Sequence, residues 1–285
     1  LVSLSWNPTG ALSSVSVGTR TWSYGYTDGH LSQVTLPDGS FQAFDMAQIS
    51  SAMTVGVSVS CAANVGLATI VDGWPSGSPQ IAGSMISASG LKANYILGER
   101  LHARAKVPLF CTPASMNQPQ DYAVISPYFV SFSLLSRRYV GPGVDQQWLY
   151  DYSFATPSWN TCTTCTGTTT TEVTKPDGSK DRYSHSAEWG AYEGKLLQLD
   201  EGIRLGSASR TTVYEYAQNE GMPYPAELGR INSMQGKANT LPSTTHAPLK
   251  SKSIIQEGVV HTYVVNEFDA YARPVSVTES SEQLP

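Results

Sequence analysis

The sequence predicts an all-β fold, and three observations support this. The phrase Val-Thr-x-Pro-Asp-Gly-Ser occurs at 34–40 and again at 173–179, each time between stretches of alternating polar and apolar residues. Proline sets φ near −65° and glycine accepts positive φ, so Pro-Asp-Gly reverses the chain between two strands. Aromatic residues two positions apart, such as Trp22 and Tyr24, fall on one face of a strand. Finally, no segment has the periodicity of a convincing amphipathic helix.

Residues 1–45 are predicted to form two or three β-hairpins. In residues 6–15 an aromatic residue is followed by a small residue at +4, an apolar residue at +6 and valine at +9. Residues 26–34 repeat this order with one residue fewer, and residues 268–277 repeat it near the end. The small residue lets the chain reverse, and the later residues return to the packed face of the partner strand. A recurring strand–turn–strand unit indicates a repeat architecture.

Residues 46–145 interrupt the repeat and are predicted to be a less regular β insertion. Short alternating runs, such as 81–86 and 128–134, are separated by longer connections there. Leu91, Tyr95 and Leu101 could also share one face of a short helix over 91–101, although no capping residue supports it.

One uncharged stretch of the insertion, between Asp45 and Asp72, is long enough to span a bilayer. Its alternation at 54–60 and its dilution by Ser, Thr and Asn favour buried or half-buried strands instead. We therefore do not expect a membrane helix here.

Residues 146–285 are predicted to return to the hairpin pattern. A segment rich in Pro, Ser and Thr at 219–250 is expected to be a long surface loop or an irregular strap. The alternating pattern resumes over 253–277. The chain starts at Leu1 without a charged leader and stops soon after a repeat copy, so we expect both ends to continue into a longer polypeptide.

The composition suits strands with uncharged polar faces and argues against nucleic-acid binding. Charged residues make up 14% of the chain, well below the roughly 25% of an average soluble domain. The net charge is −5, and Lys and Arg form no basic stripe. The most basic stretch, residues 100–106, is interpreted as a solvated strand or loop.

The four cysteines, Cys61, Cys111, Cys162 and Cys165, allow two disulfides in three pairings. Cys162 and Cys165 form a CxxC among Thr and Asn residues, which favours a local disulfide that pins a loop. A pairing of Cys61 with Cys111 would close the insertion on itself. Free thiols remain an alternative, whereas zinc binding would need a second CxxC or paired histidines nearby.

No catalytic, cofactor-binding or metal-binding residues are predicted. The Gly-x-Ser-x-Gly match at 73–77 contains proline before the serine and lacks a strand-to-helix context, so it is interpreted as a plain turn. The five histidines are dispersed, and phosphate-binding loops and dinucleotide fingerprints are absent. A glycosidase would need two carboxylates that only the fold can bring together. The candidate carboxylates are Asp151, Glu172, Glu188 and Asp200, and the aromatic residues that could stack on sugars are Trp159, Trp189 and Tyr192.

The repeated phrases resemble a known family. Residues 268–277, Phe-Asp-Ala-Tyr-Ala-Arg-Pro-Val-Ser-Val, are similar to the RHS repeat, also called the YD repeat, although Ala272 and Pro274 stand where that repeat usually has Gly and Leu. Residues 170–183 resemble a linking strand pair of such proteins, and residues 83–111 resemble a non-repeat stretch of large bacterial RHS proteins. The resemblance implies a ribbon of β-hairpins wound as a curved or spiral wall around a cavity.

The resemblance also implies a function. RHS shells belong to exported bacterial proteins, secreted or at the cell surface, and enclose a C-terminal toxic segment until its delivery. On this hypothesis the chain is a non-catalytic structural module whose partners are further repeats and the toxic segment of its own polypeptide. The alternative is an adhesin-like surface module in which exposed Tyr and Trp bind a glycan or a receptor. A glycoside hydrolase on a β scaffold is the third hypothesis. Buried aromatics favour the shell, and aromatics exposed beside amides favour binding.

Overall fold

The computed structural model describes residues 1–50, 52, 55–56, 79–109, 111–112, 122–123, 125–153, 155–165, 167–190, 192–217, 221–224 and 247–284. The described residues form an all-β protein with one short helix, α1 (Ala47–Ser50). This helix is too short to cross a bilayer, and the described part of the chain holds no other candidate span. The chain divides into two compact units, one with residues 1–53, 77–100 and 131–150, the other with 54–76, 101–130 and 151–285.

The first unit is an antiparallel sheet of consecutive hairpins. Its strands are β1 (Val2–Trp6), β2 (Leu12–Val17), β3 (Arg20–Thr27), β4 (His30–Thr35), β5 (Phe41–Asp45) and β7 (Gln80–Ile86), with the larger parts of β8 (Lys92–Ala103), β11 (Tyr128–Gly141) and β12 (Val144–Tyr152). Each of β1 to β4 pairs with the next strand, and β7 pairs with both β5 and β8. Residues 1–45 thus form four consecutive antiparallel strand pairs, where two or three hairpins were expected.

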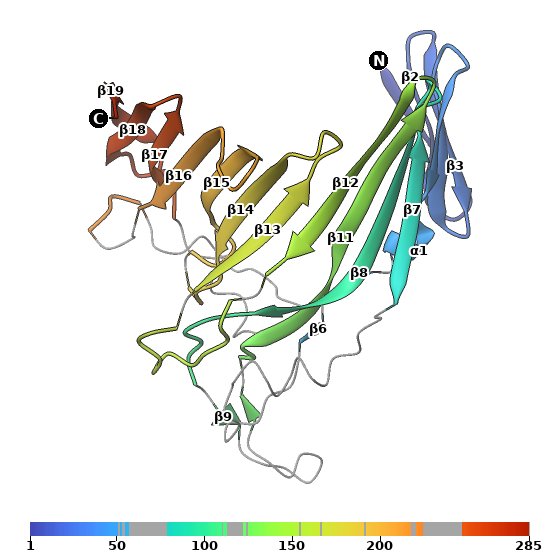
Figure 1. The fold of residues 1–285 in the computed structure, drawn as a ribbon. Coiled ribbons are helices and arrows are strands. Elements are labelled where there is room, and N and C mark those ends of the chain that lie inside the picture. Colours follow the sequence, from blue (N-terminus) through green and yellow to red (C-terminus); the bar gives the residue numbers. More distant parts are fainter. Residues whose placement is uncertain are drawn as a thin grey trace. The chain divides into compact units, whose positions relative to one another are not determined.

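The second unit repeats this arrangement over seven strands in chain order (Figure 1). They are β13 (Thr168–Thr174), β14 (Lys180–Ser186), β15 (Leu196–Ile203), β16 (Arg210–Tyr216), β17 (Leu249–Gln256), β18 (Val259–Phe268) and β19 (Pro274–Gln283). Every neighbouring pair is antiparallel. The short strands β6 (Val55–Gly56), β9 (Cys111–Thr112) and β10 (Tyr122–Ala123) also belong to this unit. The strand pattern predicted over 253–277 is confirmed.

One turn geometry recurs at five places in the chain. In each copy the first residue donates its N–H to the carbonyl of the fifth residue, and the fourth donates to the carbonyl of the first, with N···O distances of 2.8–3.0 Å. The fourth residue always has positive φ, between 58° and 85°. This is a three-residue hairpin connection in which a type I turn is followed by a left-handed residue. The five copies are 7–11, 36–40, 87–91, 175–179 and 269–273.

Both Pro-Asp-Gly phrases adopt this turn, as predicted. Asp38 and Asp177 sit in the middle of their turns, and each accepts the N–H of the serine two residues later at 3.0 Å. In the copies at 7–11 and 269–273, the side chain of the first residue accepts the hydrogen bonds from backbone N–H groups of the turn. Asn7 and Asp269 accept N–H groups from the third and fifth residues of their turns. Side-chain oxygens thus satisfy the turn amides that the ladder leaves unpaired.

The helix that the spacing of Leu91, Tyr95 and Leu101 allowed does not form. Residues 92–103 are strand β8, which pairs with β7 from Lys92 to Gly98. The three residues are separated by even numbers, so a strand also places them on one face. A Cβ at Gly98 would lie 2.7 Å from Leu135 Cδ1, so a larger residue there would require the Leu135 side chain to shift.

Two buried clusters form the core of the second unit. The first contains Leu101, Ala103, Tyr128 and Val130, with Trp159 packed against them. The second contains Ala217, Tyr224, Val265 and Phe268, with Met222, Tyr263 and Ala272 packed against them. Three aromatic residues, Tyr128, Tyr224 and Phe268, are therefore buried core residues of this unit.

Ala272 is the exception among the fourth residues of the five turns, because it adopts φ 58° without being glycine. We expect Ala272→Gly to raise the free energy of unfolding by about 0.5 kcal/mol, since relief of the left-handed strain exceeds the entropy that glycine adds to the unfolded chain. Urea denaturation measures the change. Ala270→Gly, in the same turn but with negative φ, is the control and should destabilise. Equal losses in both variants would contradict the prediction.

Asp177 should titrate far below an ordinary aspartate. Hydrogen bonds from Ser179, reinforced by Arg204, lower the pKa of Asp177 from 3.8 to about 2. Because the folded pKa lies below the unfolded one, the turn contributes stability above pH 4 and loses it as the pH falls toward 2. Carbon-13 NMR of the carboxyl group measures this pKa directly. Ser179→Ala should move it upward, and an unchanged value would contradict the assignment.

Candidate functional site

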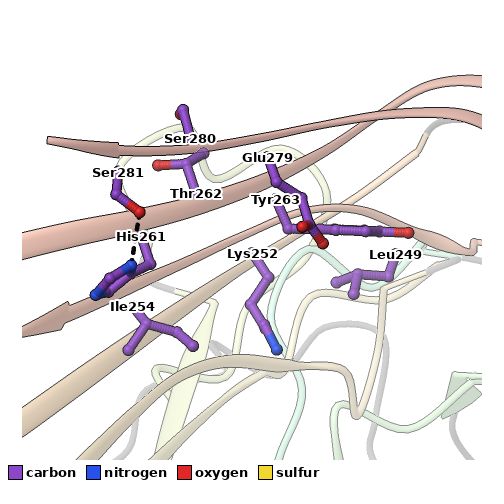
Figure 2. Close-up of a pocket in the computed structure, with 9 residues that line it drawn as sticks. All are labelled: Leu249, Lys252, Ile254, His261, Thr262, Tyr263, Glu279, Ser280 and Ser281. Atoms are coloured by element: carbon purple, nitrogen blue, oxygen red, sulfur yellow. Dashed lines mark hydrogen bonds between the residues drawn. The ribbon is translucent and has the colours of Figure 1, made fainter.

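A groove of about 620 Å³ lies on the sheet formed by β17, β18 and β19. Figure 2 shows side chains from all three strands around it. Most are polar, and one aromatic residue lies among them. The lining residues are Leu249, Lys252, Ile254, His261, Thr262, Tyr263, Glu279, Ser280 and Ser281.

The strand register arranges these side chains in two rows across the sheet. Lys252 pairs with Tyr263, and Tyr263 pairs with Glu279. Each step is one strand spacing, about 4.8 Å. Tyr263 therefore lies between a cation and an anion on one face of the sheet (Figure 2).

In the second row, His261 lies between Ile254 and Ser281. The His261 ring nitrogen Nδ1 and the Ser281 hydroxyl are 2.8 Å apart, which holds the imidazole in place. Figure 2 shows both rows on the same side of the sheet, whereas Thr262 and Ser280 point the other way.

Tyr263 packs on a buried cluster, whereas Lys252 and Glu279 beside it form no ion pair with any residue that the structure describes. Its side chain packs against the cluster around Val265 and Phe268. Lys252 and Glu279 take part in none of the ion pairs of the described residues. The groove thus offers a fixed aromatic ring with a free donor on one side and a free acceptor on the other.

A second cluster in the same unit surrounds Arg104. Its Nε donates to Glu193 Oε1 at 2.5 Å, and both side chains are largely buried, with 13% and 16% exposed. The guanidinium also lies over the rings of Phe129, at 4.7 Å, and Trp189, at 5.6 Å. Cation–π contacts of this kind strengthen as water is excluded.

The backbone around Arg104 joins three segments of the chain. Ala105 exchanges hydrogen bonds with Ala187 and Trp189, and Val107 exchanges them with Ser158 and Asn160. Ala105 and Val107 are completely buried. We call this cluster the Arg104 joint; it comprises residues 104–107, 158–160, 186–190 and 192–193.

Three features describe the packing of the Arg104 joint. Lys106 adopts φ 57°, a left-handed conformation that costs energy for a side chain of this kind, and its ammonium pairs with Glu188. A Cβ at Gly167 would lie 2.0 Å from Glu188 Cγ, so any other residue there would require the Glu188 side chain to shift. Burial raises the pKa of Glu193 more than Arg104 lowers it, and its Oε2 is buried without a hydrogen-bond partner.

The fold brings two of the candidate carboxylates, Glu172 and Asp200, into one row with a cation between them. Glu172 and Asp200 flank Arg182 in one row across β13, β14 and β15. Lys180 and Arg182 lower the pKa of Glu172, so it is poorly suited to act as a general acid. Asp200 instead accepts hydrogen bonds from Gln198 and Thr211.

The other predicted residues are distributed between the Arg104 joint and the surface. Glu188 and Trp189 belong to the joint, and Trp159 packs on the first core cluster. Burial raises the pKa of Tyr192. Asp151 is exposed and accepts the N–H of Tyr152. The serine turn at 73–77 lies outside the described residues.

The local disulfide predicted for the CxxC is present. Cys162 and Cys165 are bonded, with an S–S distance of 2.00 Å. Cys111 is also disulfide-bonded, and Cys61, its expected partner, lies outside the described residues. Among the residues that the structure describes, no group of three or more His, Cys, Asp or Glu is placed to hold a metal ion.

Sequence reasoning missed both clusters. The row of Lys252, Tyr263 and Glu279 depends on the register of three strands. A sequence signal exists only for the pairing of Lys252 with Tyr263. It is the hairpin turn at Glu257 and Gly258, both with positive φ, which pairs Gln256 with Val259 and thereby sets the register of the two strands. The pairing of Arg104 with Glu193 joins residues 89 positions apart and has no local signal.

Comparison with known proteins returned no matching family model and no matching curated protein.

The buried ion pair of the Arg104 joint predicts a large asymmetry between single and double substitutions. Glu193→Gln leaves the Arg104 charge unpaired and should lower the free energy of unfolding by about 3 kcal/mol. Arg104→Met combined with Glu193→Met removes both charges and should cost less than Glu193→Gln alone. Urea unfolding followed by tryptophan fluorescence measures these changes.

The exposed pair Arg138–Asp145, with 50% and 57% of its side chains accessible, provides the control. Asp145→Asn should change the stability by less than about 0.5 kcal/mol. Equal effects of Glu193→Gln and Asp145→Asn would show that the Arg104 joint does not depend on its buried charges.

Proposed function

We propose that the chain is a non-catalytic structural module, a stretch of an RHS-type shell that encloses a C-terminal toxic segment of an exported bacterial protein. The observation that carries the proposal is the turn that recurs five times with the same hydrogen bonds and the same left-handed fourth residue. One turn reused along a chain of antiparallel strands is the pattern expected of a repeat architecture. A curved or spiral hairpin wall is part of the same proposal.

The exposure of the outermost strands supports a sheet that continues. All ten residues of β19 are exposed, and β18 is its only paired strand among the described residues. All five residues of β1 are exposed as well, including Val2, Leu4 and Trp6, whose exposed fractions are 62%, 53% and 62%. Long exposed edges with apolar side chains are normally covered, so further repeats of the same polypeptide are the partners we propose for them.

The disulfides support the exported location in the proposal. Cys162–Cys165 is closed, and Cys111 is bonded too. Disulfides persist mainly in oxidising compartments, such as the bacterial periplasm and the cell surface. Low charge content and polar uncharged strands suit the same setting.

The shell hypothesis predicts that the wall protects what it encloses. In the longer polypeptide, limited proteolysis should spare the C-terminal segment while the wall is intact. Thr262→Pro removes a ladder hydrogen bond in β18, which pairs with both β17 and β19, and should open the wall and expose the segment to the protease.

Ala270→Pro is the matched control, because it places proline at the second position of an exposed turn that tolerates it. Protection should survive this change. Equal cleavage of the C-terminal segment in the parent and in Thr262→Pro would overturn the shell function.

A further inference from the structure

An arginine surrounded by aromatic side chains lies on the sheet of the first unit, whereas the groove and the Arg104 joint belong to the second. The guanidinium of Arg137 lies over the ring of Trp148, at 4.6 Å, and near that of Tyr139, at 5.8 Å. The two rings meet edge to face, with centroids 5.4 Å apart. Arg137 and Tyr139 alternate along β11, and Trp148 of β12 pairs with Arg137, so the three side chains share one face of the sheet.

Tyr95 of β8 lies beside these three residues. Burial raises the pKa of Tyr95, the neighbouring Tyr139 adds to this shift, and the charge of Arg137 opposes it. Both groups must be close to the Tyr95 hydroxyl to act on it in this way. We call Tyr95, Arg137, Tyr139 and Trp148 the Arg137 cluster. All four residues are partly exposed, so a ligand can reach them from solvent.

The Arg137 cluster has no carboxylate to balance its cation. Arg137 takes part in none of the ion pairs of the described residues. Its Nε is buried and has no hydrogen-bond partner in this part of the chain. A buried donor without an acceptor is costly, especially on a charged group. The rings attract the charge, but they do not replace an oxygen acceptor for the Nε–H group.

The other arginines that lie over aromatic rings show which group is missing. Within the described residues there are two of them, Arg104 and Arg273. The Nε of Arg104 donates to the carboxylate of Glu193 at 2.5 Å, and the Nε of Arg273 donates to that of Asp269 at 2.7 Å. Arg137 has the ring contacts of these two residues without their carboxylate. An acceptor supplied from outside the described contacts would complete the same arrangement.

We propose that the Arg137 cluster is a docking site for an acidic segment of a protein partner, whose Asp or Glu carboxylate accepts hydrogen bonds from the Arg137 guanidinium. The planar guanidinium suits a carboxylate, which can accept two of its N–H groups at once. One cation balances one carboxylate, whereas a phosphate would bring about two negative charges. Tyr95, Tyr139 and Trp148 supply aromatic surface, and Arg, Trp and Tyr are the residues that contribute most at protein interfaces. This inference goes beyond the shell function and does not depend on it.

The test selects phage-displayed peptides of random sequence on the whole chain, with counter-selection on Arg137→Met. We expect the enriched peptides to share an Asp or Glu at one position. Synthetic copies with acetylated and amidated ends are then measured by fluorescence anisotropy. Replacing the shared acidic residue by its amide should weaken binding about tenfold or more, because a charge-assisted hydrogen bond is lost.

Variants of the chain show whether the peptide binds at Arg137. Arg137→Met should weaken binding about tenfold or more. Arg137→Lys keeps the charge but loses the planar fork, so it should weaken binding too. Arg138→Met is the matched control, because Arg138 faces the other side of the sheet and pairs with Asp145. It should leave the affinity unchanged. Circular dichroism and urea unfolding check that each variant is folded.

Several results would overturn the proposal. One is a selection that enriches no peptide or no acidic residue, and another is an equal loss of affinity in Arg137→Met and Arg138→Met. Tighter binding of a peptide with phosphoserine in place of the acidic residue would assign the site to a phosphorylated partner instead. Self-association of the parent chain that Arg137→Met abolishes, measured by light scattering, would assign it to a second copy of the chain.

Discussion

The structure depends on one constraint, the hairpin connection that turns the chain through a single left-handed residue. Five copies share the same two backbone hydrogen bonds, including the copy at 87–91 within the irregular insertion. Such a connection fixes which residues face each other across a strand pair, because a slip of one position would move every side chain to the opposite face. In the row through Tyr263, the copy at 269–273 connects β18 to β19, while a different turn at Glu257 and Gly258 aligns Lys252 with Tyr263.

The Arg104 joint connects parts of the chain that the pairing of neighbouring strands does not connect. Antiparallel pairing links each strand to its immediate neighbours, whereas the joint connects residues 104–107 to segments more than 50 positions later in the sequence. It does so with buried charge, cation–π contacts and a left-handed Lys106. Burying charge is costly unless it is well paired, so such a joint defines one arrangement more effectively than it adds stability.

Local features were predictable from the sequence, and long-range ones were not. The hairpins at both ends, the two Pro-Asp-Gly turns and the Cys162–Cys165 disulfide follow from residue types whose conformational preferences act over a few positions. Leu91, Tyr95 and Leu101 fit both a helix and a strand, and only pairing with β7 decides between them. Arg104 and Glu193 carry no signal at all until the fold brings them together.

The glycine at position 167 bears on how such a chain can vary over evolutionary time. Most glycines of positive φ lie in turns with open space around them, so a substitution there meets backbone strain but no steric clash. At Gly167 the limit is steric instead, because an added methyl group would require the Glu188 side chain to move. Since Glu188 also pairs with Lys106, a change of residue at position 167 would have to be accompanied by a change in that ion pair.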